Sequence, residues 1–331
     1  MLIGHKKQWD FLKNKLESGQ LAHAYLFSGE EKIGKRTLAK EFVKLINCLS
    51  AEAGKSPGQE SCGICRNCKD IENESYVDVL MVNLKNDKQE IDISQIREAL
   101  LFLSYKSYYG SFKAVIVNGA EKMNFEAQSC LLKTLEEPKG KTILILISPH
   151  PETLLSTIIS RCQRIKFYLV DPKEIEYNLV KMGESLPAGR QEKIAHDLAS
   201  FCSCKPGQAI ELFLNPDKLK EEQTTLQELV KVINSNLALK FQYTKKINLD
   251  GNNTKRVLEI LQRYLRHLLF LKTGADNLTP KDFFPEAADN FKNYSISKIK
   301  EVLKLLEIIN AQISLTNANP KLALEILLME M

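Results

Sequence analysis

Short apolar runs, separated by helical patterns, fill the first half of the chain. The runs are almost continuous and lack the alternating polar residues of a sheet with one exposed face. Continuous runs of this kind are typical of parallel strands that helices cover on both faces. The sequence predicts strands over residues 24–28, 77–84, 114–117, 143–147 and 164–167.

Apolar positions three and four residues apart predict helices between these strands. Leu38, Phe42 and Leu45 share one face of a helix predicted over residues 35–46. Two further helices are marked by Ile93, Ile96 and Leu100, and by Ala127, Leu131 and Leu135 before Pro138. The alternation of strands and helices predicts an α/β domain with a parallel sheet over residues 1–167.

Beyond Val170 the strand pattern stops and the sequence is helical throughout. Residues 168–213 predict a small domain of short helices, with a break at residues 205–207. Residues 214–331 predict a second helical domain, with apolar stripes over residues 226–233, 257–269 and 299–309. Such stripes favour packing in a helical core, and contacts between subunits are the alternative.

The composition narrows the class of protein only slightly. The chain has 331 residues, 44% of them hydrophobic and 26% charged, with a net charge of +5. These values are ordinary for a globular protein, and the mild charge permits nucleic-acid contact without arguing for it. The N-terminal segment lacks the apolar core of a signal peptide, and the longest apolar run is too short to cross a bilayer. We therefore expect a cytoplasmic protein without membrane contact.

Residues 28–37 nearly match a phosphate-binding loop. Gly29, Gly34 and Lys35 fit the pattern G-x-x-x-x-G-K-[ST], between a predicted strand and a predicted helix. In this context backbone N–H groups can hold a phosphate, and Lys35 can reach its outer oxygens. Arg36 replaces the Ser or Thr that would hold Mg²⁺, and Thr37 comes one position late, about 100° round the helix. The alternative is a sharp turn that needs two glycines.

The second half of an ATPase site also lacks its usual residues. ATPases place an acidic pair after a later strand, to hold Mg²⁺ and to polarise the attacking water. The strand over residues 114–117 is followed instead by Asn118, Gly119 and Ala120, and Glu121 fits an ordinary helix start. We therefore expect a fold that kept its phosphate loop without the hydrolytic chemistry, and that binds ATP and Mg²⁺ weakly or not at all.

Four of the eight cysteines form a pattern typical of a metal site. Cys62, Cys65 and Cys68 are each separated by two residues, and Cys48 ends the preceding helix. Four thiolates can close a tetrahedral zinc site, and that leaves no open position for catalysis. The polar segment between the helices has few apolar residues, so a metal would supply its order. The sequence predicts a structural zinc module over residues 48–68; ordinary thiols and an iron–sulfur cluster are the alternatives.

These motifs lie in blocks that resemble the delta-prime family of the bacterial DNA polymerase III clamp loader, a group of AAA+ proteins. The resemblance covers most of the chain and is weakest in the last helical domain. It is carried by the glycine-loop region (residues 16–42), the cysteine module, IDISQIREAL, KAVIVNGAEKMNFEAQSCLLKTLEEP, LLSTIISRCQRIKF and ANPKLALEILL.

The resemblance implies a P-loop AAA+ domain, a small helical lid and a helical collar that joins a five-subunit ring with gamma or tau and delta subunits. That ring places a sliding clamp on primer–template DNA as part of a DNA polymerase holoenzyme. Delta-prime subunits are rigid members that do not hydrolyse ATP themselves. The family's SRC triplet corresponds to Ser160, Arg161 and Cys162, and its arginine enters the neighbouring subunit's ATP site. The resemblance therefore implies that Arg161 is an arginine finger supplied in trans.

Two other functions fit parts of the sequence. An active ATPase subunit of the gamma or tau type would have to hold Mg²⁺ despite Arg36 and Asn118. A zinc-dependent nucleic-acid-binding module would have to act without an obvious basic stripe or stacking platform, since Trp9 is the single tryptophan.

Overall fold

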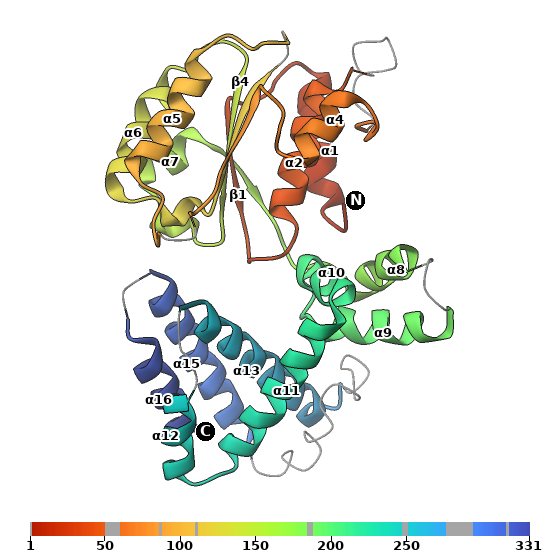
Figure 1. Cartoon of the computed structure of the whole chain (residues 1–331), viewed down its shortest axis with the longest axis vertical. Helices are drawn as coiled ribbons and strands as arrows, with labels where there is room; N and C mark the ends of the chain where they lie inside the picture. Colours follow the sequence, from red (N-terminus) through yellow and green to blue (C-terminus); the bar gives the residue numbers. More distant parts are fainter. Residues whose placement is uncertain are drawn as a thin grey trace. The chain divides into compact units, whose positions relative to one another are not determined.

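The computed structural model describes residues 2–49, 60–85, 88–109, 112–183, 188–246, 251–275, 294–315 and 318–331 (Figure 1). Part of the predicted zinc module, residues 50–59, lies outside the described residues, but all four of its cysteines are described. The chain divides into two compact units, Met1–Val170 and Asp171–Met331.

The first unit contains a parallel five-stranded sheet in the order β2-β3-β4-β1-β5. The strands are β1 (Ala24–Ser28), β2 (Val79–Val82), β3 (Lys113–Asn118), β4 (Thr142–Ser148) and β5 (Gln163–Lys166). The predicted parallel α/β domain is therefore confirmed. Because all strands run the same way, Ser28, Asn118 and Ser148 meet at the carboxyl edge, where such sheets bind ligands.

Helices cover both faces of this sheet (Figure 1). One face carries α1 (Lys6–Glu17), α2 (Lys35–Asn47) and α4 (Arg66–Glu72), and the other carries α5 (Ile93–Ser104), α6 (Phe125–Glu136) and α7 (Ser156–Arg161). The short helical turns η1 (Ala120–Lys122) and η2 (Pro151–Thr153) follow β3 and β4. Every residue of β1 is buried, because Tyr25 and Phe27 pack on one side and Leu26 packs on the other.

The sequence analysis did not predict two helices of the first unit, α1 and α4. Helix α1 lies in a segment rich in lysine, where the two residues that it buries, Trp9 and Leu12, are three positions apart. Two apolar residues give too weak a periodic signal to predict a helix. The predicted strand over residues 77–84 is also shorter in the structure, where β2 begins at Val79 and ends at Val82.

The second unit is helical throughout its described residues. Its helices are α8 (Pro172–Met182), α9 (Ala188–Phe201), α10 (Pro206–Leu214), α11 (Pro216–Ile233), α12 (Leu237–Lys246), α13 (Gly251–Lys272), α15 (Ile296–Leu315) and α16 (Pro320–Glu330). The three predicted apolar stripes lie in α11, α13 and α15, and their apolar residues are mostly buried. The predicted break at residues 205–207 overlaps the start of α10, whose first residue is Pro206, and the chain between α9 and α10 covers residues 202–205.

The guanidinium of Arg263 contacts one helix on its own side of the predicted boundary at residue 213 and one helix on the other side. The guanidinium of Arg263 on α13 lies 2.8 Å from the carboxylate of Glu222 on α11, and both side chains are almost fully buried. The same guanidinium lies over the ring of Phe201 on α9, 4.5 Å from its centroid. The separation of a domain over residues 168–213 from another over residues 214–331 stays a prediction.

Candidate functional site

The glycine loop joins β1 to α2 at the carboxyl edge of the sheet. Lys35 is the first residue of α2, and only 5% of it is exposed. Its ammonium group donates hydrogen bonds to the backbone carbonyls of Gly29 and Glu30, which are part of the loop itself. The cation that would reach a phosphate in a working loop is therefore held by the loop's own carbonyls.

Gly29 is required by a close approach within the first unit. Its φ is +143°, and a Cβ at this position would lie 2.6 Å from the carbonyl oxygen of Phe167. The Phe167 N–H in turn donates to the carbonyl oxygen of Ser28 at 2.7 Å. The tight turn after β1 thus fits against the segment that follows β5, and only glycine leaves room for it.

The N-terminal segment also contacts the loop. The Nε2 atom of His5 lies 2.7 Å from the carbonyl oxygen of Ile33, and its ring packs edge-on against Phe167 with 4.8 Å between the centroids. The same ring lies about 3.8 Å from the position that a Cβ on Gly34 would take. His5 was not predicted as a site residue, because no motif connects residue 5 to the loop.

The two residues after the loop lysine, Arg36 and Thr37, lie on the first turn of α2. The Nη2 atom of Arg36 lies 2.5 Å from a carboxylate oxygen of Glu74, just beyond the end of α4. Lys40, one turn further along α2, pairs with the same carboxylate at 2.7 Å, and these contacts hold the pKa of Glu74 below its usual range. Thr37 is exposed on α2. Arg36 therefore links α2 to the residues that directly follow α4, the helix that carries Cys68.

Polar side chains without metal-binding carboxylates follow β3. The amide of Asn118 donates to the side-chain oxygen of Asn83 at 3.3 Å, across the edge between β3 and the loop after β2. Gly119 has a φ of +80°, which turns the chain into η1. An amide pair fills this position, so the acidic Mg²⁺ ligand of an ATPase is replaced by a neutral contact.

Glu121 lies near the loop, but in a setting that disfavours its charge. Burial raises the pKa of Glu121, the nearby charge of Glu31 adds to that shift, and a hydrogen bond with Ser148 at the end of β4 opposes it. Its Oε2 atom is buried and has no hydrogen-bond partner within the part of the chain that the structure describes. Burial therefore disfavours the charged form of this carboxyl group.

The four predicted metal ligands come together. The sulfur atoms of Cys48, Cys62, Cys65 and Cys68 all lie within 4.8 Å of one another, and three of the pairs are 3.5, 3.9 and 4.0 Å apart. Zinc bound to four thiolates at ~2.3 Å places sulfur atoms about 3.8 Å apart. The four thiols can therefore hold a tetrahedral metal ion with little movement.

Backbone and side-chain contacts shape this cysteine cluster. The N–H groups of Cys65 and Cys68 donate to the sulfur atoms of Cys62 and Cys65 at 3.3 and 3.5 Å. Next to the cluster, buried Asn67 donates to the carbonyl oxygen of Asn47 at 2.8 Å and so ties α4 to the end of α2. N–H groups that donate to sulfur, as those of Cys65 and Cys68 do, stabilise thiolates around a bound metal and fix their directions.

Arg161 is the last residue of α7. Its Nη1 atom donates to the carbonyl oxygen of Thr157 at 3.0 Å, and its Nη2 atom lies 2.8 Å from Oε1 of Glu136, the last residue of α6. The Arg161 side chain keeps 34% of its surface exposed. Next to it, burial raises the pKa of the Cys162 thiol to about 12, so this thiol stays neutral. The sequence analysis did not predict the contact with Glu136, since the two residues lie far apart in the chain.

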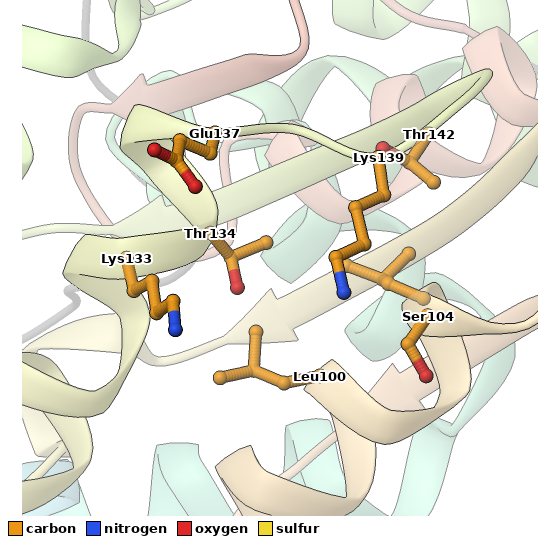
Figure 2. Close-up of a pocket in the computed structure, with 8 residues that line it drawn as sticks. Leu100, Ser104, Lys133, Thr134, Glu137, Lys139 and Thr142 are labelled. Carbon is orange, nitrogen blue, oxygen red and sulfur yellow. The ribbon is translucent and has the colours of Figure 1, made fainter.

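A separate surface groove lies between α5, α6 and the start of β4 (Figure 2). Thr142 is the first residue of β4, so this groove is at the amino edge of the sheet, away from the glycine loop. Lys133 and Lys139 lie on different sides of it, and Leu100 and Glu137 also line it. The groove is therefore not part of the candidate nucleotide site.

Comparisons with known proteins identify relatives of the chain. A family model described as "DNA polymerase III, delta subunit" matches residues 4–171. The chain is 30% identical over 302 residues to DNA polymerase III subunit delta' of Bacillus subtilis (strain 168), which covers 89% of this chain and 87% of the relative. It is 37% identical over 143 residues to subunit delta' of Pseudomonas aeruginosa, covering 43% of this chain and 42% of the relative.

A third relative represents another type of subunit. DNA polymerase III subunit tau of Bacillus subtilis is 28% identical over 289 residues, which cover 82% of this chain and 50% of the relative. The chain thus spans most of the delta' relative and half of the tau relative. Among the described residues, no helix is long and apolar enough to cross a membrane.

Proposed function

The chain belongs to the clamp-loader family of DNA polymerase III subunits, and we propose that within it this protein is a delta-prime-type subunit that does not hydrolyse ATP. In this proposal it assembles with gamma or tau and delta subunits into a five-membered ring. The ring places a sliding clamp on primer–template DNA. Residues 1–167 are the AAA+ domain, residues 168–213 the lid and residues 214–331 the collar that joins the subunits.

The observation that carries the proposal is the set of partners around the glycine loop. Lys35 contacts loop carbonyls, Arg36 contacts Glu74, and Asn118 contacts Asn83. A working ATPase needs the loop lysine on the phosphates and oxygen ligands on Mg²⁺. Each of these three side chains has a partner within the chain. Neither Arg36 nor Asn118 offers a carboxylate or hydroxyl oxygen to the metal. The loop then serves as a structural turn.

Arg161 has the opposite role in the proposal. It enters the ATP site of the neighbouring subunit, where its guanidinium stabilises the negative charge that builds up on the transferring phosphoryl group. Its position at the end of α7 and its exposed surface support this role. The subunit thus contributes to hydrolysis at a neighbour's site without a hydrolytic site of its own.

Calorimetry on the full chain tests the first half of the proposal. We expect no binding heat when Mg-ATP is titrated to millimolar concentration. Tight binding that depends on Mg²⁺ would contradict the proposal. A parallel assay of ATP hydrolysis by the chain alone and with its partner subunits separates its own activity from its effect on a neighbour.

We further propose that the four cysteines hold a structural Zn²⁺ ion. The four sulfur atoms lie close to the spacing of a tetrahedral site, and four protein ligands leave no position for a substrate. Metal analysis of the purified chain is expected to give one zinc per chain, and Cys62→Ser is expected to lower that content strongly. Iron with visible absorption would instead identify an iron–sulfur cluster. Full protection of all four thiols from alkylation only when metal is present would support the assignment.

An active ATPase subunit of the gamma or tau type is the alternative. It is favoured by the tau relative, whose identity to this chain is nearly that of the delta' relative, 28% against 30%. It would require Arg36 to leave Glu74 and a new ligand to complete the Mg²⁺ shell. Hydrolysis of ATP by the purified chain, lost in Lys35→Ala, would establish this alternative.

A further inference from the structure

We propose that Glu136 is a positioning residue for Arg161, and that it holds the guanidinium ready for the phosphoryl group in the neighbouring subunit's site. This inference rests on the proposed role of Arg161. It extends that role to a residue on a different helix, which no motif of the sequence singles out.

Two contacts from two different helices hold the guanidinium of Arg161. Nη1 donates to the carbonyl oxygen of Thr157, one turn earlier on α7, at 3.0 Å. Nη2 donates to Oε1 of Glu136, at the end of α6, at 2.8 Å. Two donors on different acceptors fix the plane of a guanidinium, whose other N–H groups can still face an acceptor outside.

A second contact fixes α7 against α6 at the amino-terminal end of α7. The side chain of Gln128 is buried, donates to the carbonyl oxygen of Met123 at 3.0 Å, and accepts from the N–H of Leu155 at 2.9 Å. Between the two ends, the fully buried Ile158 packs into the core on that side of the sheet. Helix α7 therefore has a defined place on α6, and Glu136 extends that order to the side chain of Arg161.

Helix stability does not explain a glutamate at this position. The carbonyl end of a helix has a partial negative charge, so Glu136 is unfavourable at the end of α6, whereas Arg161 is favourable at the end of α7. Half of the Glu136 side chain is exposed, and an exposed ion pair adds little to folding stability. The contact is thus better explained by its effect on the direction of Arg161.

A flexible arginine loses rotamer freedom when it binds a phosphoryl group. Glu136 restricts that freedom beforehand, so less of it is lost in the transition state. The contribution of one exposed ion pair corresponds to a factor of about five in rate. We therefore expect Glu136→Gln to lower kcat of ATP hydrolysis in the reconstituted clamp-loader complex about fivefold, with KM unchanged.

The matched control is Glu137→Gln. Glu137 is adjacent, exposed and equally charged, but its side chain lines the groove of Figure 2 and makes no hydrogen bond or ion pair with any described residue. This variant is expected to hydrolyse ATP like the unmodified complex. Thermal unfolding and assembly of the complex are expected to be unchanged in both variants.

A double-mutant cycle with Arg161→Ala separates positioning from an independent effect. If Glu136 acts through Arg161, Glu136→Gln lowers kcat no further once Arg161 is absent. The inference would be overturned if Glu136→Gln lowered kcat as much in the Arg161→Ala background as in the unmodified complex. It would also be overturned if Glu136→Gln alone left kcat unchanged or increased it. An unchanged kcat in Arg161→Ala would instead overturn the proposed arginine finger, so the two failures are distinguishable.

Discussion

Lys35 in the glycine loop and Arg161 at the end of α7 are both cations that phosphate chemistry could use, but their surroundings differ. Lys35 is 5% exposed and is held by carbonyl oxygens of the loop that precedes it. The Arg161 side chain is 34% exposed and is held by one carboxylate and one carbonyl. The first cation therefore stabilises a turn, and the second is oriented while it stays accessible.

Under the proposed function, one domain has lost its own nucleotide site and contributes to another. A nucleotide site needs several groups at once, so in this proposal Arg36 and Asn118 together remove its metal ligands. An arginine supplied to a neighbour needs only its own helix and a partner that orients it. The two sites depend on different residues, and substitutions are therefore expected to affect them separately.

The largest effect is expected for Arg161→Ala. An arginine finger contributes at least about 10³-fold to kcat at the site that it enters, and the variant should lose that factor there. Single-turnover hydrolysis in the reconstituted complex measures it. Arg164→Ala is the control, because Arg164 is equally charged, exposed and on the neighbouring β5. Equal rates for Arg161→Ala and Arg164→Ala would contradict the proposed role of Arg161.

Gly29→Ala tests whether the loop is a structural turn. The new Cβ would lie 2.6 Å from the carbonyl oxygen of Phe167, on a backbone with a φ of +143°. We expect the free energy of unfolding to fall by ~2–4 kcal/mol. In Gly140→Ala the φ is +66° and the Cβ meets no atom within 4 Å, so ~1 kcal/mol is expected. Denaturant unfolding of both variants checks this, and equal losses would contradict the packing argument.

Glu121→Gln is expected to stabilise the protein in a pH-dependent manner. Burial raises the pKa of Glu121, so the folded protein binds this proton more tightly than the unfolded chain does. The carboxyl group therefore costs stability above its folded-state pKa, and the cost disappears below its unfolded-state pKa. We expect a gain of ~1 kcal/mol at pH 7.5 and almost none at pH 4.

The control for this prediction is Glu98→Gln, because Glu98 is exposed on α5. Its substitution is expected to change stability by less than about 0.5 kcal/mol at both pH values. A gain for Glu121→Gln that does not depend on pH would show that charge burial is not its cause.

The smallest effect is expected for Thr37→Ala. Thr37 is exposed on α2. Under the proposed function, its position one residue late keeps it from replacing the missing metal ligand. The free energy of unfolding should change by at most about 0.5 kcal/mol, and ATP hydrolysis by the complex should not change. A marked loss of activity would mean that Thr37 contacts a bound nucleotide, and the alternative ATPase function would then gain support.

Most of the sheet could be predicted because its strands are continuous apolar runs, which few other structures produce. Helix α1 could not be predicted, because Trp9 and Leu12 are the only two residues that this helix buries. Among the candidate site residues, the four cysteines were predictable from spacing alone, and their sulfur atoms do come together. His5, Glu74 and Glu136 were not, because each meets its partner only after distant segments fold together.

The sequence by itself determined which groups are present: a loop with Gly29 and Lys35, no hydroxyl or carboxylate at positions 36 and 118, four cysteines, and an arginine before the last strand. Spacing along the chain suffices for these, because local geometry links residues a few positions apart. Only the tertiary structure decided where the charges point. Lys35 donates to its own loop and Arg161 to Glu136, because a long side chain contacts whichever groups the packing of the chain places within its reach.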